Sequence, residues 1–148
     1  MKLLIKVLTL ALLLSSFTSN AEPTKEWIIQ FVKASENSKK PKATEEDIEV
    51  FLAMMSDDIL DVHVQYDVEK KGKEKFRKSL LSSRSRMIGV KKSIEDMILG
   101  SDTAVVVVNE ESSYYKNDIV KNFKGRTILV LHFNKEGVVK EMRRFLHQ

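Results

Sequence analysis

His63 and Tyr66 are the residues in this 148-residue chain that first suggest proton-transfer chemistry. An imidazole gains and loses a proton near neutral pH, so a histidine that faces a cavity can act as a general acid or base. Tyr66 follows three positions later and could present its hydroxyl at the mouth of such a cavity. The alternative for Tyr66 is an ordinary aromatic strand residue followed by the turn acid Asp67.

The orientation of His63 is ambiguous in the sequence. Residues 59–66 alternate and are rich in valine, which predicts a strand. Leu60, Val62 and Val64 have the opposite parity to His63, so simple alternation places them in the core and His63 on the outer face. A histidine in a pocket and a solvated strand histidine therefore both remain open.

Several chemistries are excluded or unsupported by composition. The chain has no cysteine, which rules out thiol catalysis, zinc fingers and iron–sulfur clusters. Its three histidines are scattered singly, so we expect no metal site, and no motif predicts a cofactor. Basic clusters at residues 39–42, 70–75 and 91–92 are interleaved with acids and lack aromatic partners, which favours a solvated surface over nucleic-acid binding.

The first 21 residues predict a cleavable signal peptide. Lys2 and Lys6 precede the apolar run at residues 7–14, and Ser19-Asn20-Ala21 offers small residues for cleavage after Ala21. The apolar run is shorter than a membrane span, so we expect a periplasmic or secreted protein with no membrane association after cleavage. Residues 22–148 then form one domain, because glycine and proline are too sparse for a linker.

The pattern of elements in residues 22–148 predicts an α+β fold. Thr44 followed by Asp47 is typical of a helix start, and Gly89 marks the change from helical to alternating periodicity. Charged or glycine-containing turns separate the later segments. The predicted helices cover residues 26–36, 44–55 and 73–86, residues 67–72 form a turn, and the predicted strands cover residues 59–66, 90–99, 103–116, 121–133 and 138–146.

The order α-α-β-α-β-β-β-β resembles the nuclear transport factor 2-like superfamily, in particular its SnoaL-like branch. Three segments carry the resemblance: MSDDI at residues 55–59, GKEKF at residues 72–76 and HFNKEGVVKEMR at residues 132–143. The resemblance implies a cone-shaped, bent antiparallel sheet wrapped around three N-terminal helices, with a conical cavity. It also implies a range of functions, from ketosteroid isomerases, polyketide cyclases, epoxide hydrolases and dehydratases to pocket proteins without a known reaction.

The resemblance also assigns positions. His63 falls where the ketosteroid isomerases carry their proton-shuttling aspartate, but their oxyanion donors fall near Phe31 and Leu129, so we do not expect steroid isomerase chemistry. Related enzymes use late-strand acids to bind or polarise substrate, a role open to Glu141. A surface ion pair between Glu141 and Arg143 is the alternative.

Three functional hypotheses follow. The first is binding of a small, largely apolar molecule in the cavity, and the second is an isomerase, hydratase or dehydratase with His63 as acid/base, assisted by Tyr66, Tyr115 or Glu141. The third is a dimeric interaction module without ligand, which would pair through the outer sheet face at Ile128, Val130 and His132. The expected cavity walls, for which plain core packing is the alternative, are Trp27, Phe31, Phe51, Met54, Met55, Tyr115, Leu129, Leu131 and Phe133.

Tyr114 and Tyr115 are adjacent on a predicted strand, so their side chains point to opposite faces. One of the two could supply a hydroxyl to the cavity. Alternation does not say which, and an ordinary pair of hairpin aromatics is the other interpretation.

Overall fold

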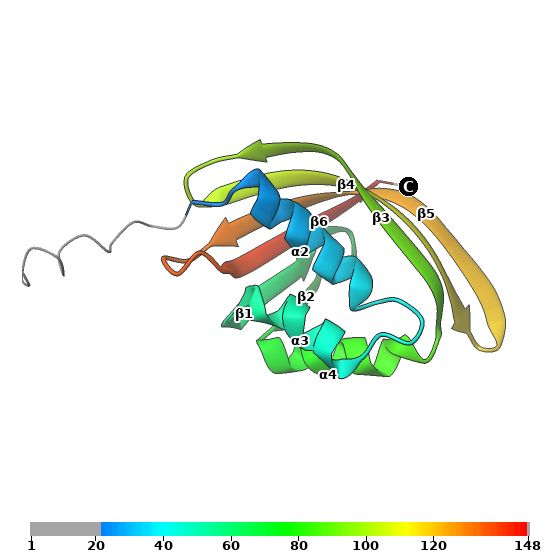
Figure 1. Cartoon of the computed structure of the whole chain (residues 1–148). Helices are drawn as coiled ribbons and strands as arrows, with labels where there is room; N and C mark the ends of the chain where they lie inside the picture. Colours follow the sequence, from blue (N-terminus) through cyan, green and yellow to red (C-terminus); the bar gives the residue numbers. More distant parts are fainter. Residues whose placement is uncertain (1–21, 148) are drawn as a thin grey trace, which may run out of the picture.

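The computed structural model describes residues 22–147 (Figure 1). Three helices and a short 3-10 turn accompany a six-stranded sheet that curves around helix α2. The predicted signal peptide lies outside the described residues, so export stays a prediction. Within residues 22–147, no helix is both long enough and apolar enough to cross a membrane.

The helices begin where the sequence supplies partners for their free amides. Thr24 caps α2 (Lys25–Asn37) by accepting a hydrogen bond from the Trp27 amide at 3.1 Å. Thr44 and Asp47 form a reciprocal capping box at the start of α3 (Glu45–Ala53), as their spacing predicts. Helix α4 (Lys73–Arg84) follows Gly72, whose φ of 92° is a conformation that favours glycine.

The sheet is mixed and has the strand order β2-β1-β6-β5-β4-β3. All neighbouring pairs are antiparallel except β1 and β6, which are parallel. The predicted α+β fold with a cone-shaped sheet is confirmed. The sheet is not purely antiparallel, because β1 and β6 lie side by side and run in the same direction. The strands are β1 (Met55–His63), β2 (Val68–Lys71), β3 (Met87–Leu99), β4 (Thr103–Lys116), β5 (Ile119–Phe133) and β6 (Val139–His147).

The segment around the predicted first strand differs most from expectation. Strand β1 starts four residues earlier than predicted and ends at His63, where the 3-10 turn η1 (Val64–Tyr66) begins. Asp67 then adopts a left-handed conformation with φ of 50°, which reverses the chain. Part of the predicted turn at residues 67–72 consequently becomes strand β2, which pairs with β1.

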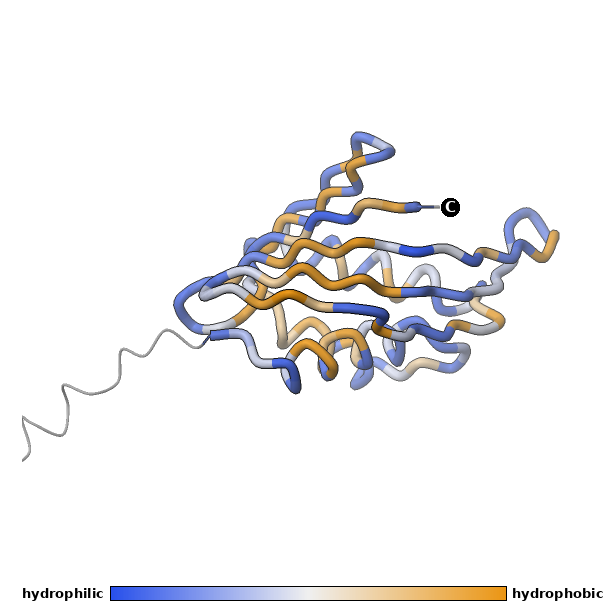
Figure 2. Tube along the Cα trace, turned by 90° about the horizontal axis from the view of Figure 1, so that it is seen from above, coloured by the Kyte–Doolittle hydropathy of each residue, from blue (hydrophilic) through white to orange (hydrophobic). Residues whose placement is uncertain are grey.

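The long strands β4 and β5 change character along their length. Their paired halves at residues 103–108 and 127–133 are mostly apolar, whereas residues 109–126 are mostly polar. Figure 2 shows this change as strands that turn from orange to blue toward one end. The apolar half packs on the helices through fully or nearly fully buried Phe31, Phe51 and Leu131. The polar half leaves room for a site at the other end of the cone.

Candidate functional site

The His63 side chain lines a cavity of about 260 Å³ between α2 and the concave face of the sheet. Its apolar walls include Phe31, Val108, Leu129 and Met142. Its polar walls also include Ser35, Lys39, Tyr66, Lys92, Glu110, Ser112, Tyr114, Thr127 and Arg144. Most of the residues that line the cavity are thus polar or charged, in contrast to the mostly apolar walls that the sequence predicts.

The inward orientation of His63 contradicts the prediction from alternation. Ile59 has the same parity as His63 and is fully buried, while Leu60 on the other face is only partly buried. Both faces of β1 therefore carry apolar residues, and the Leu60, Val62 and Val64 pattern could not decide which face is the core. Asp61, which the sequence analysis passed over, lies on the His63 face and is 1 % exposed.

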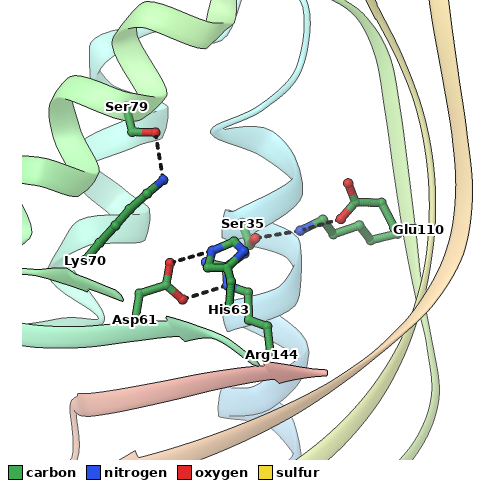
Figure 3. Close-up of polar contacts among 8 residues, drawn as sticks. Ser35, Asp61, His63, Lys70, Ser79, Glu110 and Arg144 are labelled. Atoms are coloured by element: carbon green, nitrogen blue, oxygen red, sulfur yellow. Dashed lines mark hydrogen bonds and ion pairs between the residues drawn. The ribbon is translucent and has the colours of Figure 1, made fainter. Parts of the chain in front are cut away.

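Asp61 lies between two cationic or ionisable partners (Figure 3). Its Oδ2 atom is 3.0 Å from Nε2 of His63, and its Oδ1 atom is 2.7 Å from Nε of Arg144. Burial by itself raises the pKa of Asp61, but the hydrogen bonds and charges of His63 and Arg144 outweigh burial and lower it. Asp61 is therefore an ionised acceptor at neutral pH, which requires the His63 Nε2 atom to carry a proton.

A second polar cluster, formed by Ser35, Lys92 and Glu110, lines the same cavity. The Nζ atom of Lys92 donates to Oγ of Ser35 at 2.8 Å and lies 3.2 Å from Oε2 of Glu110. The Lys92 side chain is only 7 % exposed, so the prediction that residues 91–92 belong to a solvated basic surface is wrong for Lys92. The one signal in the sequence is that Lys91 and Lys92 are adjacent on a predicted strand, so that only one of the two side chains can point inward.

The two clusters are electrostatically connected across the cavity. The positive charge of Arg144 lowers the pKa of both Lys92 and Glu110, as does that of Lys39. Burial is the largest effect on each: together with the neighbouring cations it lowers the pKa of Lys92 to about 7 against the opposing charge of Glu110. Burial raises the pKa of Glu110, whose net shift is nevertheless downward because of the surrounding cations. The cavity thus holds a carboxylate–guanidinium pair and a carboxylate–amine pair in place of plain core packing.

The other two predicted catalytic residues, Tyr66 and Glu141, lie in different parts of the structure. Tyr66 lines the cavity and is 58 % exposed, which places it at the rim. Glu141 lies on β6 outside the cavity and accepts a hydrogen bond from Nε of Arg143 at 2.6 Å. Glu141 therefore forms the surface ion pair with Arg143 that was the alternative to a catalytic role.

Some of the residues predicted to form the cavity walls line the cavity, and the others are buried in the hydrophobic core. Phe31 and Leu129 line the cavity, whereas Phe51, Met55 and Leu131 are buried in the core beneath it. The Trp27 ring lies 5.4 Å from that of Phe31 and 5.1 Å from that of Phe133, and Met54 packs partly buried against the same cluster. Core packing, the alternative for these residues, is thus what the structure assigns to most of them.

Tyr114, and not Tyr115, lines the cavity. Tyr114 shares the inward parity of Val108, Glu110 and Ser112 on β4, whereas Tyr115 is 48 % exposed on the other face. The assignment of Tyr115 to the ligand site is therefore corrected.

Phe123 is a lining residue that the sequence analysis missed. Its ring folds over Gly125 on the same strand, where a Cβ atom would come within 2.5 Å of the ring tip. Glycine at position 125 lets this aromatic ring lie along the cavity wall.

The outer face of the sheet carries partly buried Ile128, Val130 and His132, as the alternation of β5 predicts. His132 accepts or donates a hydrogen bond with Oγ1 of Thr103 at 3.2 Å. The structure describes one chain, so pairing of two copies through this face stays a prediction.

A larger hollow of about 410 Å³ lies near Ser101 and Asn134, but neither His63, Tyr66 nor Glu141 lines it. Among residues 22–147, no group of acids and histidines is arranged to hold a metal ion.

Comparisons with known proteins identify the fold. No known family profile and no curated protein matches the sequence. Among solved structures, the chain is similar to a candidate SnoaL-like polyketide cyclase from Shewanella denitrificans, with a TM-score of 0.70, 14% identity and coverage of 83% of this chain and 89% of the other. It is also similar to a nuclear transport factor 2-like protein of unknown function from Exiguobacterium sp., with a TM-score of 0.67, 12% identity and coverage of 82% and 98%. An LEH-like epoxide hydrolase from M. tuberculosis gives a TM-score of 0.59 at 16% identity, with coverage of 80% and 81%.

These likenesses establish that the chain has the nuclear transport factor 2-like fold, in its SnoaL-like and ketosteroid isomerase-like form. The resemblance found in the sequence is thereby confirmed at the level of fold. At such low identities the comparisons carry no reaction or substrate over to this chain.

Proposed function

We propose that this protein binds a small molecule in the cavity beside His63, with an apolar body against Leu129 and Met142 and a polar group toward the charged clusters. The observation that carries the proposal is the arrangement of Asp61, His63 and Arg144. Two ionised side chains are buried at the edge of an open space, although burying charge in a small domain costs free energy. Groups arranged in this way suit recognition of a polar ligand better than stability.

Proton transfer to or from the ligand is the second candidate function, and the Asp61–His63 pair favours it. Because the ionised Asp61 accepts from Nε2, the neutral His63 ring carries its lone pair on Nδ1. A carboxylate that fixes the tautomer and stabilises the protonated ring is the usual partner of a histidine base. This arrangement would serve isomerisation, hydration or dehydration of a bound molecule, reactions that begin with removal or addition of one proton.

Side-chain NMR on the whole chain tests the ligand binding that both candidates require. Titrating the protein with small alcohols, ketones and carboxylic acids should shift the methyl signals of Leu129 and Met142 and the ring signals of His63. The ring signals of His132, on the outer sheet face, serve as the control and should stay unchanged. Ligands that shift His132 and leave the cavity methyls unchanged would contradict the proposal, since binding would then occur on the surface.

A further inference from the structure

Lys92 is a buried amine that lines the cavity and takes no part in the proposed chemistry of His63. We propose that Lys92 forms a Schiff base with a small aldehyde or ketone that enters the cavity. This inference rests on the proposed function in one respect only, that the cavity admits a small molecule. It adds a second reactive group and a substrate class, uncharged carbonyl compounds.

The hydrogen bonds of Lys92 suit a nucleophile. A neutral amine has two N–H donors and one lone pair, and the Nζ atom of Lys92 has two acceptors within reach, Oγ of Ser35 at 2.8 Å and Oε2 of Glu110 at 3.2 Å. Both donors can therefore be satisfied while the lone pair stays free to attack. Because the residue also lines the cavity, a bound carbonyl carbon can approach the nitrogen without crossing the protein interior.

The surroundings of Lys92 favour its neutral form. Burial and the positive charges of Lys39 and Arg144 lower the pKa of Lys92 to about 7, against the opposing charge of Glu110. Ser35 is the remaining polar side chain in contact with the amine and carries no charge. At pH 7 about half of the Lys92 amines would be neutral, whereas an ordinary lysine with a pKa near 10.4 is neutral about once in a few thousand molecules. Desolvation beside a second cation is a known way to activate a lysine nucleophile.

Glu110 is placed to move the protons that the reaction requires. As the C–N bond forms, the attacking nitrogen becomes positively charged, and the Glu110 carboxylate can accept one of its protons. That proton passes to the carbonyl oxygen, which becomes a hydroxyl. Glu110 can then take the second N–H proton and deliver it to this hydroxyl as the C–O bond breaks, so that the neutral amine and the carbonyl compound yield an imine and one water. No oxidant, reductant or further reactant is needed.

Lys91 provides a matched control for Lys92. It is the preceding residue on the same strand and is exposed, whereas the Lys92 side chain is 7 % exposed and turned inward. A reagent that reacts only because lysines are accessible should therefore prefer Lys91. A reagent that reacts because an amine is neutral and faces the cavity should prefer Lys92.

Reductive trapping tests the inference. The protein is incubated briefly at pH 7 with less than one equivalent of benzaldehyde and with cyanoborohydride, and the alkylated lysines are identified by peptide mass spectrometry. We expect Lys92 to be labelled at least about tenfold more than Lys91. The Lys92→Arg variant, which keeps the positive charge near Glu110 but has no nucleophilic amine, should lose the preferred adduct. Labelling spread over exposed lysines with Lys92 unmodified would overturn the inference.

A parallel binding measurement separates this inference from the proposed function. Benzyl alcohol has the shape of the probe but no carbonyl group, and its binding is followed through the methyl signals of Leu129 and Met142. If those signals shift and Lys92 is still not labelled, the Schiff base is wrong and the binding cavity stands. If neither the signals shift nor Lys92 reacts, both the Schiff base and the binding cavity are contradicted.

Discussion

The Asp61 carboxylate accepts a hydrogen bond from the His63 ring, with 3.0 Å between Oδ2 and Nε2. Its other oxygen is held by Arg144, from the parallel neighbour strand β6. Residues 83 positions apart thus meet because the first and last long strands lie side by side. The topology of the sheet thus brings Arg144 to the Asp61–His63 pair, whose two members lie on one strand.

Asp61→Asn should destabilise the protein strongly. The substitution keeps the size of the side chain but leaves the Arg144 guanidinium, 15 % exposed, without its counter-charge. Losing one partner of a buried ion pair typically costs about 3 kcal/mol of unfolding free energy or more. Urea denaturation measures the change. Asp57→Asn is the control, because its side chain is 98 % exposed and its loss should change stability little. Equal effects of the two substitutions would contradict the importance of the buried pair.

The same Asp61→Asn substitution should reverse the tautomer of His63. In the wild type the ionised carboxylate requires a proton on Nε2, whereas the asparagine amide can donate to Nε2 and so favours a proton on Nδ1. Nitrogen-15 NMR of the histidine rings distinguishes the two tautomers directly. His132, which contacts Thr103, should keep its pattern in the variant. An unchanged His63 pattern would mean that Asp61 does not set the tautomer.

Glu36→Gln should alter the acid dependence of stability. Glu36 ties the end of α2 to β3 by accepting from the Lys92 amide at 2.8 Å. Burial raises the pKa of Glu36, but that bond, the hydrogen bonds from Lys33 and Lys40 and the charge of Lys33 outweigh it and lower the pKa from 4.5 to about 2. Since the folded-state pKa is depressed, the ionised group stabilises the fold fully above pH 4.5, and the effect is lost as the pH falls toward 2.

Urea denaturation from pH 7 to pH 2 measures this effect. The variant should be less stable than the wild type at pH 7, and the difference should shrink steadily below pH 4.5. A difference that stays constant over the whole range would show that Glu36 acts by packing and not by charge.

Leu129→Trp should block the cavity. Leu129 lines the cavity wall, so a larger aromatic ring would fill the space that a ligand needs. Val130→Trp is a matched control, because the next residue on β5 points to the outer face. We expect ligand-induced NMR shifts of Met142 to disappear in the first variant and to persist in the second. Loss of binding in both would indicate general damage to the fold.

Much of the fold could be predicted because its signals are local. Thr44 with Asp47 marks a helix start, and the turn residues between strands mark the hairpins. Strand β2 could not be predicted in this way, since its four residues are charged or exposed and pair only because Asp67 reverses the chain. The parallel pairing of β1 with β6 likewise depends on long-range packing that the sequence pattern does not contain.

The site could be predicted only in part. His63 was found from its chemistry, but its orientation depends on the register of β1, whose two faces both carry apolar residues. Asp61, Lys92 and Glu110 were missed because a charged residue on a strand normally indicates a solvated face. Here they are buried in pairs, and only the folded chain brings the partners together.

Native mass spectrometry of the whole protein, incubated with a mixture of small alcohols and carboxylic acids, is the most direct test of a ligand-binding cavity beside His63. We expect a bound mass that denaturation removes, carried by the wild type and by Val130→Trp but not by Leu129→Trp. Bound mass on Leu129→Trp equal to that on the wild type, or none on any of the three proteins, would contradict a ligand-binding cavity beside His63.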